Sequence, residues 1–196
     1  MGGFYALEET RINLKKLAKR YGTAFHEGCV DAILPEQKQV KCSDGRIFSY
    51  DALVLNTGVE TQGEASDSRI FPVKPMGRLI ELQQKREAGD ISSILVAGGG
   101  AAGVELTLNL SHPDQKRATP PERITLLHNG NRLLPGFPAR IARKLEKRLR
   151  TRGAELRLGE PWDPAQERNE EYDAIILATG NRPITAGFKH GLPEDE

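Results

Sequence analysis

Residues 94–105 read Ile-Leu-Val-Ala-Gly-Gly-Gly-Ala-Ala-Gly-Val-Glu, and this stretch decides the fold. Its apolar start is typical of a strand covered on both faces, and Gly98, Gly100 and Gly103 then follow the spacing G-x-G-x-x-G. In such a loop the first glycine allows a tight turn, the second lets backbone approach a pyrophosphate, and the third lets helix and strand pack closely. The following helix offers free N–H groups and a partial positive charge. The stretch predicts a dinucleotide site; the alternative is a glycine-rich turn that binds nothing.

The apolar pattern on both sides of this loop alternates between helices and strands. Upstream, residues 79–86 are expected to be helical and to stop at Gly89. Downstream we expect a helix over 101–110, a helix after Phe137-Pro138, and strands at 123–128, 155–158 and 173–178. Strands joined by crossover helices run parallel. The predicted fold class is therefore α/β, a Rossmann-like parallel sheet with helices on both faces.

Residues 1–60 have a different pattern. A short amphipathic helix is expected over 11–20, a strand over 23–34 and a buried strand over 52–55. Residues 39–43 and 46–49 predict a β-hairpin around Asp44-Gly45. The small, polar residues 61–68 are typical of a linker.

A nine-residue phrase occurs once on each side of the glycine loop. Residues 50–58 read Tyr-Asp-Ala-Leu-Val-Leu-Asn-Thr-Gly, and residues 172–180 read Tyr-Asp-Ala-Ile-Ile-Leu-Ala-Thr-Gly, so six of nine positions are identical. This repetition is what we expect of a chain that leaves one nucleotide-binding domain and later returns to it.

The end of the second expected strand bears on the choice of nucleotide. A carboxylate there normally binds the ribose 2′-hydroxyl of NAD. This strand ends Leu127-His128-Asn129-Gly130-Asn131-Arg132, without a carboxylate. His128 and Arg132 either contact a 2′-phosphate, which favours NADP, or are solvated loop residues. Glu105 either adds a favourable charge near the helix N-terminus or contacts the nicotinamide ribose or ring.

Composition excludes several classes of function. The net charge of +1 does not suggest a nucleic-acid partner, and the basic residues of 140–152 surround an apolar stripe, which indicates a solvated helix face. The sequence lacks the run of about 20 apolar residues that a membrane-spanning helix needs. The two cysteines, Cys29 and Cys42, are typical of reduced thiols in a cytoplasmic protein. The histidines show no metal-ligand spacing, and no catalytic side chain is evident.

These motifs together resemble the pyridine nucleotide-disulfide oxidoreductase superfamily. The resemblance rests on Tyr50 to Gly58, Ile94 to Glu105, Leu133-Leu134-Pro135 and Tyr172 to Pro183. Within the superfamily the chain is most similar to the type II NADH dehydrogenase-like branch, including modules fused to selenide, water dikinase. The resemblance implies NAD(P)H bound by this chain, FAD in the complete parent protein, and a quinone or another electron acceptor.

The resemblance also implies a domain organisation. Residues 1–60 would be a partial FAD-domain segment, 61–93 a linker and crossover helix, 94–180 an NAD(P)-binding Rossmann-like domain, and 181–196 the start of a second FAD-domain segment. Thr57-Gly58 and Thr179-Gly180 would approach the flavin side.

The chain also departs from the family pattern. It has no FAD-binding glycine loop before residue 50 and no Cys-x-x-x-x-Cys, and residues 159–172 are too few for the usual β-meander. We therefore expect a fragment or truncated relative. Two functions stay open: part of a flavin-dependent NAD(P)H oxidoreductase, or a non-catalytic dinucleotide-binding or interaction module without FAD.

Overall fold

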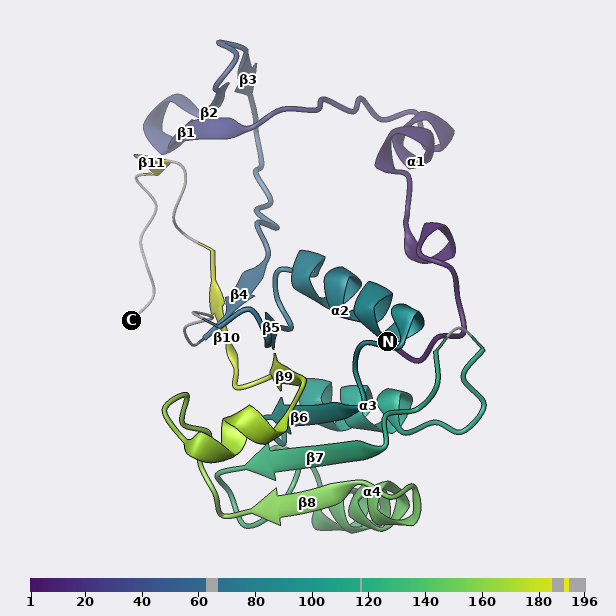
Figure 1. Cartoon of the computed structure of the whole chain (residues 1–196). Helices are drawn as coiled ribbons and strands as arrows, with labels where there is room; N and C mark the ends of the chain where they lie inside the picture. The colour runs from purple at the N-terminus through teal and green to yellow at the C-terminus, as the bar shows by residue number, and fades with distance from the viewer. Residues whose placement is uncertain (63–66, 117, 185–188, 191–196) are drawn as a thin grey trace. The chain divides into compact units, whose positions relative to one another are not determined.

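Parallel strands on either side of the glycine loop form the main sheet. The computed structural model describes residues 1–62, 67–116, 118–184 and 189–190. Their contacts divide the chain into two units, the first made of Met1–Ala6 with Val59–Arg182 and the second of Leu7–Gly58 with Pro183–Glu196. Each unit is described by itself below, and Figure 1 labels the elements of both.

The first unit is an α/β domain whose five-stranded parallel sheet has the order β5-β9-β6-β7-β8. Its strands are β5 (Ile70–Pro72), β6 (Ser93–Ala97), β7 (Arg123–His128), β8 (Glu155–Leu158) and β9 (Ala174–Leu177). Its helices are α2 (Gly77–Ala88), α3 (Ala101–Leu110), α4 (Ala139–Thr151) and the short 3-10 helix η3 (Glu167–Glu171). The parallel α/β prediction is confirmed, and α3 has the expected bounds.

Side-chain alternation along β6 shows that both faces of this sheet are covered. Ile94 and Val96 belong to one apolar cluster, and Leu95 and Ala97 belong to another. The first cluster takes in buried residues of all three α-helices: Leu79 and Leu82 from α2, Val104 and Leu110 from α3, and Leu149 from α4. The α-helices therefore pack on one face.

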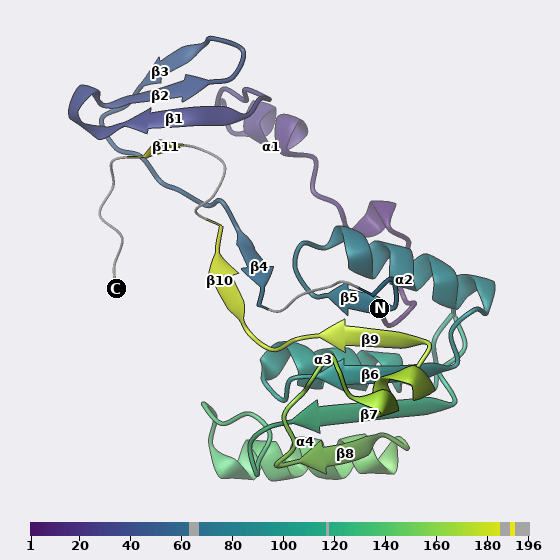
Figure 2. The ribbon, with the colours of Figure 1, turned by 60° about the vertical axis from the view of Figure 1, so that its left-hand side comes forward.

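The second face is covered differently from the prediction of helices on both faces. Trp162 and Tyr172 pack there, at the two ends of a loop that carries η3. Figure 2 shows α3 and α4 behind the sheet and η3, in yellow-green, in front of it. The connection from β8 to β9 passes β7 and β6, and a compact loop that carries η3 provides the cover.

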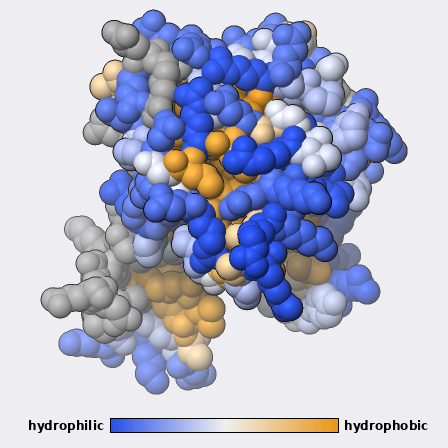
Figure 3. Space-filling model, turned by 90° about the horizontal axis from the view of Figure 1, so that it is seen from below, coloured by the Kyte–Doolittle hydropathy of each residue, from blue (hydrophilic) through white to orange (hydrophobic). Residues whose placement is uncertain are grey.

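Helix α4 is amphipathic, as expected, although one of its apolar residues lies at the surface. Ala142 and Leu149 are buried, whereas the apolar Ile141 is exposed. Seen from below the view of Figure 1, hydrophobic residues appear between hydrophilic ones on this surface (Figure 3).

The second unit is built around a small sheet of order β11-β1-β2-β3. It contains η1 (Glu8–Thr10), α1 (Leu14–Arg20), β1 (Val30–Leu34), η2 (Pro35–Gln37), β2 (Gln39–Cys42), β3 (Ile47–Ser49) and β11 (Lys189–His190). The hairpin of β2 and β3 around Asp44-Gly45 is confirmed. The strand expected over 23–34 is shorter than predicted and begins only at Val30.

The buried strand expected over 52–55 is wrong. The structure assigns no strand to these residues, and Val54 is 89% exposed. An apolar segment becomes a buried strand only with neighbours on its edges, and no described strand pairs with this one.

Beyond the two main sheets, β4 (Val59–Thr61) and β10 (Asn181–Pro183) form a two-stranded sheet. Part of the linker expected over 61–68 belongs to β4, residues 63–66 lie outside the described residues, and Asp67 begins the turn before β5.

Candidate functional site

A cleft of about 360 Å³ opens at the carboxyl ends of β6, β7 and β9. In this sheet order, β7 and β9 lie on opposite sides of β6, and ligands of open α/β sheets bind where the strand order reverses in this way. The cleft is lined by Gly98, Gly99, Gly100, Leu127, His128, Asn129, Pro135, Pro161, Trp162, Ala178, Thr179 and Gly180.

Two glycines of the loop are required by backbone packing. Gly98 has φ of +121°, and a Cβ added there would lie 2.2 Å from the Ala178 carbonyl oxygen. A Cβ on Gly103 would lie 1.8 Å from the Gly98 carbonyl oxygen. Gly103 therefore lets α3 approach the loop closely, as the spacing predicts, although it does not line the cleft.

Gly100 has a different role, because it faces open space. It precedes α3 with an ordinary φ of −73°, and a Cβ added there would meet nothing within 4 Å. None of the described side chains caps this helix N-terminus, so its first N–H groups are available to an anion. The space beside Gly100 fits a phosphate group held by backbone N–H donors.

Gly99 is a site residue that the motif did not single out. Its N–H donates to Nδ1 of His128 over 3.2 Å. A Cβ there would lie 2.5 Å from the His128 ring and 2.7 Å from Cδ2 of Leu133. The requirement for glycine at position 99 comes from residues distant in the sequence, because His128 and Leu133 lie about 30 residues away in the chain.

His128 ends β7 and lines the cleft. Burial lowers the pKa of its imidazole, which favours the neutral form. Because Nδ1 accepts from Gly99, the neutral ring carries its proton on Nε2. Nε2 is buried and has no hydrogen-bond partner among the described residues.

The other residues expected near the ribose lie outside the cleft. The Arg132 guanidinium donates to the carbonyl oxygens of Phe137 and Pro135, each over 2.8 Å. Glu105 is exposed on α3. Neither residue lines the cleft, and none of the described residues that do is acidic.

The Thr-Gly pairs have equivalent partners within their own units. In the first unit, Oγ1 of Thr179 donates to the Gln62 carbonyl over 2.7 Å, and the Gln62 N–H donates to the Gly180 carbonyl over 3.0 Å. In the second unit, Oγ1 of Thr57 donates to the Ile184 carbonyl, and the Ile184 N–H donates to the Gly58 carbonyl. Thr179 and Gly180 line the cleft, whereas Thr57 and Gly58 do not.

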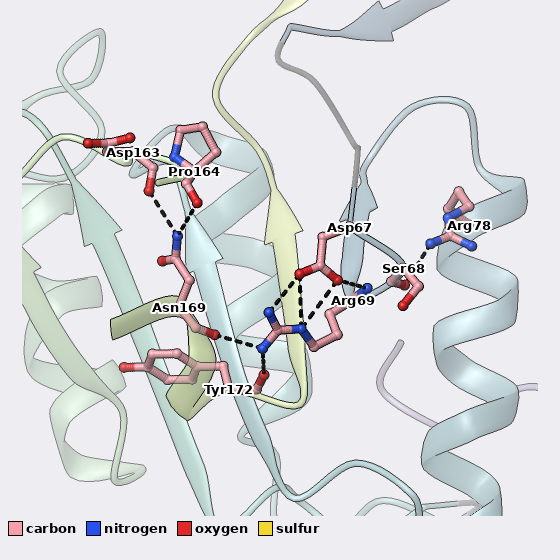
Figure 4. Close-up of polar contacts among 8 residues, drawn as sticks. All are labelled: Asp67, Ser68, Arg69, Arg78, Asp163, Pro164, Asn169 and Tyr172. Carbon is pink, nitrogen blue, oxygen red and sulfur yellow. Dashed lines mark hydrogen bonds and ion pairs between the residues drawn. The ribbon is translucent and has the colours of Figure 1, made fainter. Parts of the chain in front are cut away.

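The segment 159–172 closes the far side of the cleft through Pro161 and Trp162. Figure 4 shows how its later part is anchored: Arg69, paired with Asp67 at 2.6 Å, also donates to the carbonyls of Asn169 and Tyr172. The Asn169 amide in turn donates to the carbonyls of Asp163 and Pro164. These bonds fix the loop that carries Trp162. No sequence motif singles out Trp162 as a site residue.

The described residues also bear on metal-binding and membrane-spanning features. They contain no cluster of three or more His, Cys, Asp or Glu residues able to hold a metal ion. No helix among them is long and apolar enough to cross a bilayer. Cys29 and Cys42 are both free, the first exposed and the second buried.

Known proteins are similar to this chain in sequence. The chain is 28% identical over 189 residues to the nitric oxide reductase FlRd-NAD(+) reductase of Vibrio vulnificus, covering 86% of the chain and 46% of the relative. It is 32% identical over 109 residues to ferroptosis suppressor protein 1 of Taeniopygia guttata, covering 56% of the chain and 28% of the relative. The chain thus spans less than half the length of these relatives.

Solved structures show the same fold. The water-forming NADH oxidase of Lactobacillus brevis bound to NADH matches with a TM-score of 0.71 and 26% identity, over 94% of this chain and 44% of the oxidase. The reduced CoADR-RHD protein of Bacillus anthracis matches with a TM-score of 0.73 and 19% identity, over 94% of this chain and 36% of that protein. The model of the family described as pyridine nucleotide-disulphide oxidoreductase matches residues 6–170. The chain therefore belongs to the pyridine nucleotide-disulphide oxidoreductase family.

Proposed function

We propose that the cleft binds NADH or NADPH and that the chain is the nucleotide-binding part of a flavin-dependent NAD(P)H oxidoreductase. The observation that carries the proposal is the open space beside Gly100, at the uncapped N-terminus of α3 and at the carboxyl ends of the strands. Family members bind FAD and NAD(P)H, and the Lactobacillus brevis relative binds NADH.

The residues of the cleft have distinct roles in this proposal. Backbone N–H groups after Gly100 hold the pyrophosphate, and Gly98 and Gly103 keep the loop close to β9 and α3. Thr179 and Gly180, after β9, lie toward the nicotinamide half. When bound, the nicotinamide supplies a hydride and the flavin of the complete protein accepts it. The chain's own task is to hold the nucleotide in position and exclude water around it.

The second unit is proposed to contribute to an FAD site. G-x-G-x-x-G occurs once in the sequence, at 98–103, where it serves the first unit. Residues 1–60 and 181–196 are proposed as FAD-domain segments on the strength of the family, and Thr57-Gly58 as their contact on the flavin side. The type II NADH dehydrogenase-like branch, with a quinone or other acceptor, is likewise a proposal for the complete protein.

Calorimetry on glycine variants tests nucleotide binding. Gly100→Val places a side chain in the open space without strain in φ, so affinity for NADH and NADPH should fall at least about tenfold while the fold is kept. Gly77→Val at the start of α2 is the matched control, because its Cβ also meets nothing within 4 Å and it lies outside the cleft. Equal affinity in Gly100→Val would reject the loop as the phosphate site.

The second candidate is a dinucleotide-binding or interaction module without FAD. An absorbance spectrum of the purified complete protein separates the two functions: a flavin spectrum at near-stoichiometric level supports the oxidoreductase, and its absence after reconstitution with FAD supports the module.

A further inference from the structure

The cleft contains a second kind of recognition chemistry besides the glycine loop. Trp162 lines it and packs against the apolar cluster on the second face of the sheet. Its indole Nε1 is buried and has no hydrogen-bond partner among the described residues. A buried N–H donor without an acceptor is unfavourable, so this group is suited to a ligand that brings one.

The backbone places Trp162 beside the end of β7. After β8 the chain stays hydrogen-bonded to its neighbour, since the N–H of Gly159 donates to the Gly130 carbonyl and the N–H of Glu160 to the His128 carbonyl, each over 3.0 Å. Pro161 and Trp162 come next and line the cleft together with His128. This end of the second strand is where dinucleotide-binding folds place the adenosine ribose.

The lining of the cleft near the end of β7 combines apolar side chains with polar groups. Leu127, Pro135 and Pro161 line the cleft together with His128, Asn129 and Trp162. Nε2 of His128, like Nε1 of Trp162, is a buried ring nitrogen without a partner among the described residues. A purine nucleoside matches this lining, because its π-face stacks on an aromatic ring and its ring nitrogens and ribose oxygens accept hydrogen bonds.

We propose that Trp162, which lies beside the strand end where many dinucleotide sites carry a carboxylate, is the residue that recognises the adenosine half of the nucleotide. This inference rests on the proposed function, because it assigns the adenosine to the cleft that binds NAD(P)H. The indole ring stacks on the adenine, and Nε1–H donates to an acceptor of the adenosine. The anchored loop 159–172 holds the indole in place through Arg69 and Asn169.

The sequence makes this inference directly measurable, because Trp162 is the only tryptophan in the chain. Intrinsic tryptophan fluorescence therefore reports on this one position. Titration of the whole chain with ADP should quench the emission and saturate, and NADH should quench further by energy transfer to its nicotinamide ring. Inorganic pyrophosphate and nicotinamide mononucleotide, which lack the adenosine, should leave the emission unchanged.

Calorimetry on variants tests the energetic role. Trp162→Ala should weaken ADP about tenfold or more and leave pyrophosphate affinity unchanged, and Trp162→Phe, which keeps a stacking ring but no N–H, should lie between. Phe137→Ala is the matched control, an exposed aromatic outside the cleft. Thermal unfolding of each variant confirms that the fold is retained.

The outcomes separate this inference from the proposed function. If wild type binds NADH or NADPH but ADP leaves the emission unchanged and Trp162→Ala binds ADP normally, the adenosine assignment is wrong and nucleotide binding stands. If wild type binds neither NADH, NADPH nor ADP, both proposals fail. A loss of pyrophosphate affinity in Trp162→Ala equal to the loss for ADP would also overturn the assignment, because the residue would then act only through the shape of the loop.

Discussion

Thr57 and Thr179 make the same hydrogen bond in the two copies of the repeated phrase. The Thr57 hydroxyl donates to the carbonyl of Ile184, which lies four positions after Gly180 of the second copy. The Thr179 hydroxyl donates to the carbonyl of Gln62, which lies four positions after Gly58 of the first copy. Each of these partners returns its own N–H to the opposite glycine carbonyl. The repetition in the sequence therefore has a structural reason, because each Thr-Gly fastens the segment that follows the other copy.

Thr179→Val should destabilise the first unit by about 0.5–1.5 kcal/mol, because the valine keeps the shape and removes a 2.7 Å bond. Thr57→Val should cost the second unit less, since its bond is longer, at 3.2 Å. Urea unfolding followed by circular dichroism measures both. Unchanged midpoints in both variants would mean that water replaces the hydroxyl bonds fully.

Gly103→Ala should disrupt the packing of α3 on the glycine loop. The added Cβ would lie 1.8 Å from a backbone oxygen, which cannot rotate away as a side chain can. We expect a loss of about 3 kcal/mol in the free energy of unfolding, at the upper end for overpacked sites. Gly100→Ala, with open space around its Cβ, should lose far less. Similar stability in the two variants would contradict the backbone contact.

The sequence predicted best where local pattern alone decides the structure. The glycine spacing after an apolar strand located α3, and Asp44-Gly45 located the hairpin, where Gly45 has φ of +87°. These features depend on neighbours within a few residues. The cleft follows from them, because strand order and the glycine loop together fix its edge of the sheet.

Prediction failed where burial depends on distant neighbours. Residues 52–55 and 174–177 have nearly the same sequence, yet only the second segment lies between two strands, β5 and β6, and is buried. Gly99 was missed because its restriction comes from His128 and Leu133. Trp162 was missed because its loop is fixed by a residue distant in the sequence. Arg69 donates to the carbonyls of Asn169 and Tyr172, which lie about a hundred residues further along the chain.

Arg86 should be a strong stabilising residue of the first unit. It is 3% exposed and donates to uncharged acceptors from separate segments: Met1 O, Gln83 Oε1, Gln115 Oε1 and Thr119 O. Burial lowers the pKa of its guanidinium to about 10, so it stays charged at neutral pH. Arg86→Met leaves these acceptors unpaired and should cost at least about 2 kcal/mol in chemical denaturation.

The variant Arg86→Lys separates the effect of charge from the effect of the guanidinium geometry. It keeps the charge but lacks the planar fork that reaches several acceptors at once, so it should be nearly as unstable as Arg86→Met. Wild-type stability in Arg86→Lys would show that charge alone matters.

The preference between NADH and NADPH should be small. The cleft offers no carboxylate among its described lining residues, and both terminal nitrogens of Arg132 already donate to carbonyls. We expect affinities within about tenfold, tilted toward NADPH through His128 and the half-buried Arg132. Calorimetric titration of the whole chain measures the ratio. Arg132→Ala should remove any NADPH preference, and a tenfold preference for NADH would refute the prediction.

Stability should fall with acid through His128. Burial lowers the pKa of this imidazole in the folded state, so between that value and the ordinary value of about 6.5 the unfolded chain binds more protons. The stabilisation from the neutral ring is therefore complete above about pH 6.5 and is lost as pH falls toward the folded-state pKa. Protonation would also remove the Nδ1 acceptor for the Gly99 N–H.

The matched variant is His128→Asn, whose Oδ1 can accept that bond but does not titrate. Melting temperatures measured from about pH 7.5 to about pH 5.5 should fall more steeply for wild type than for His128→Asn. Parallel curves would show that other groups cause the pH dependence.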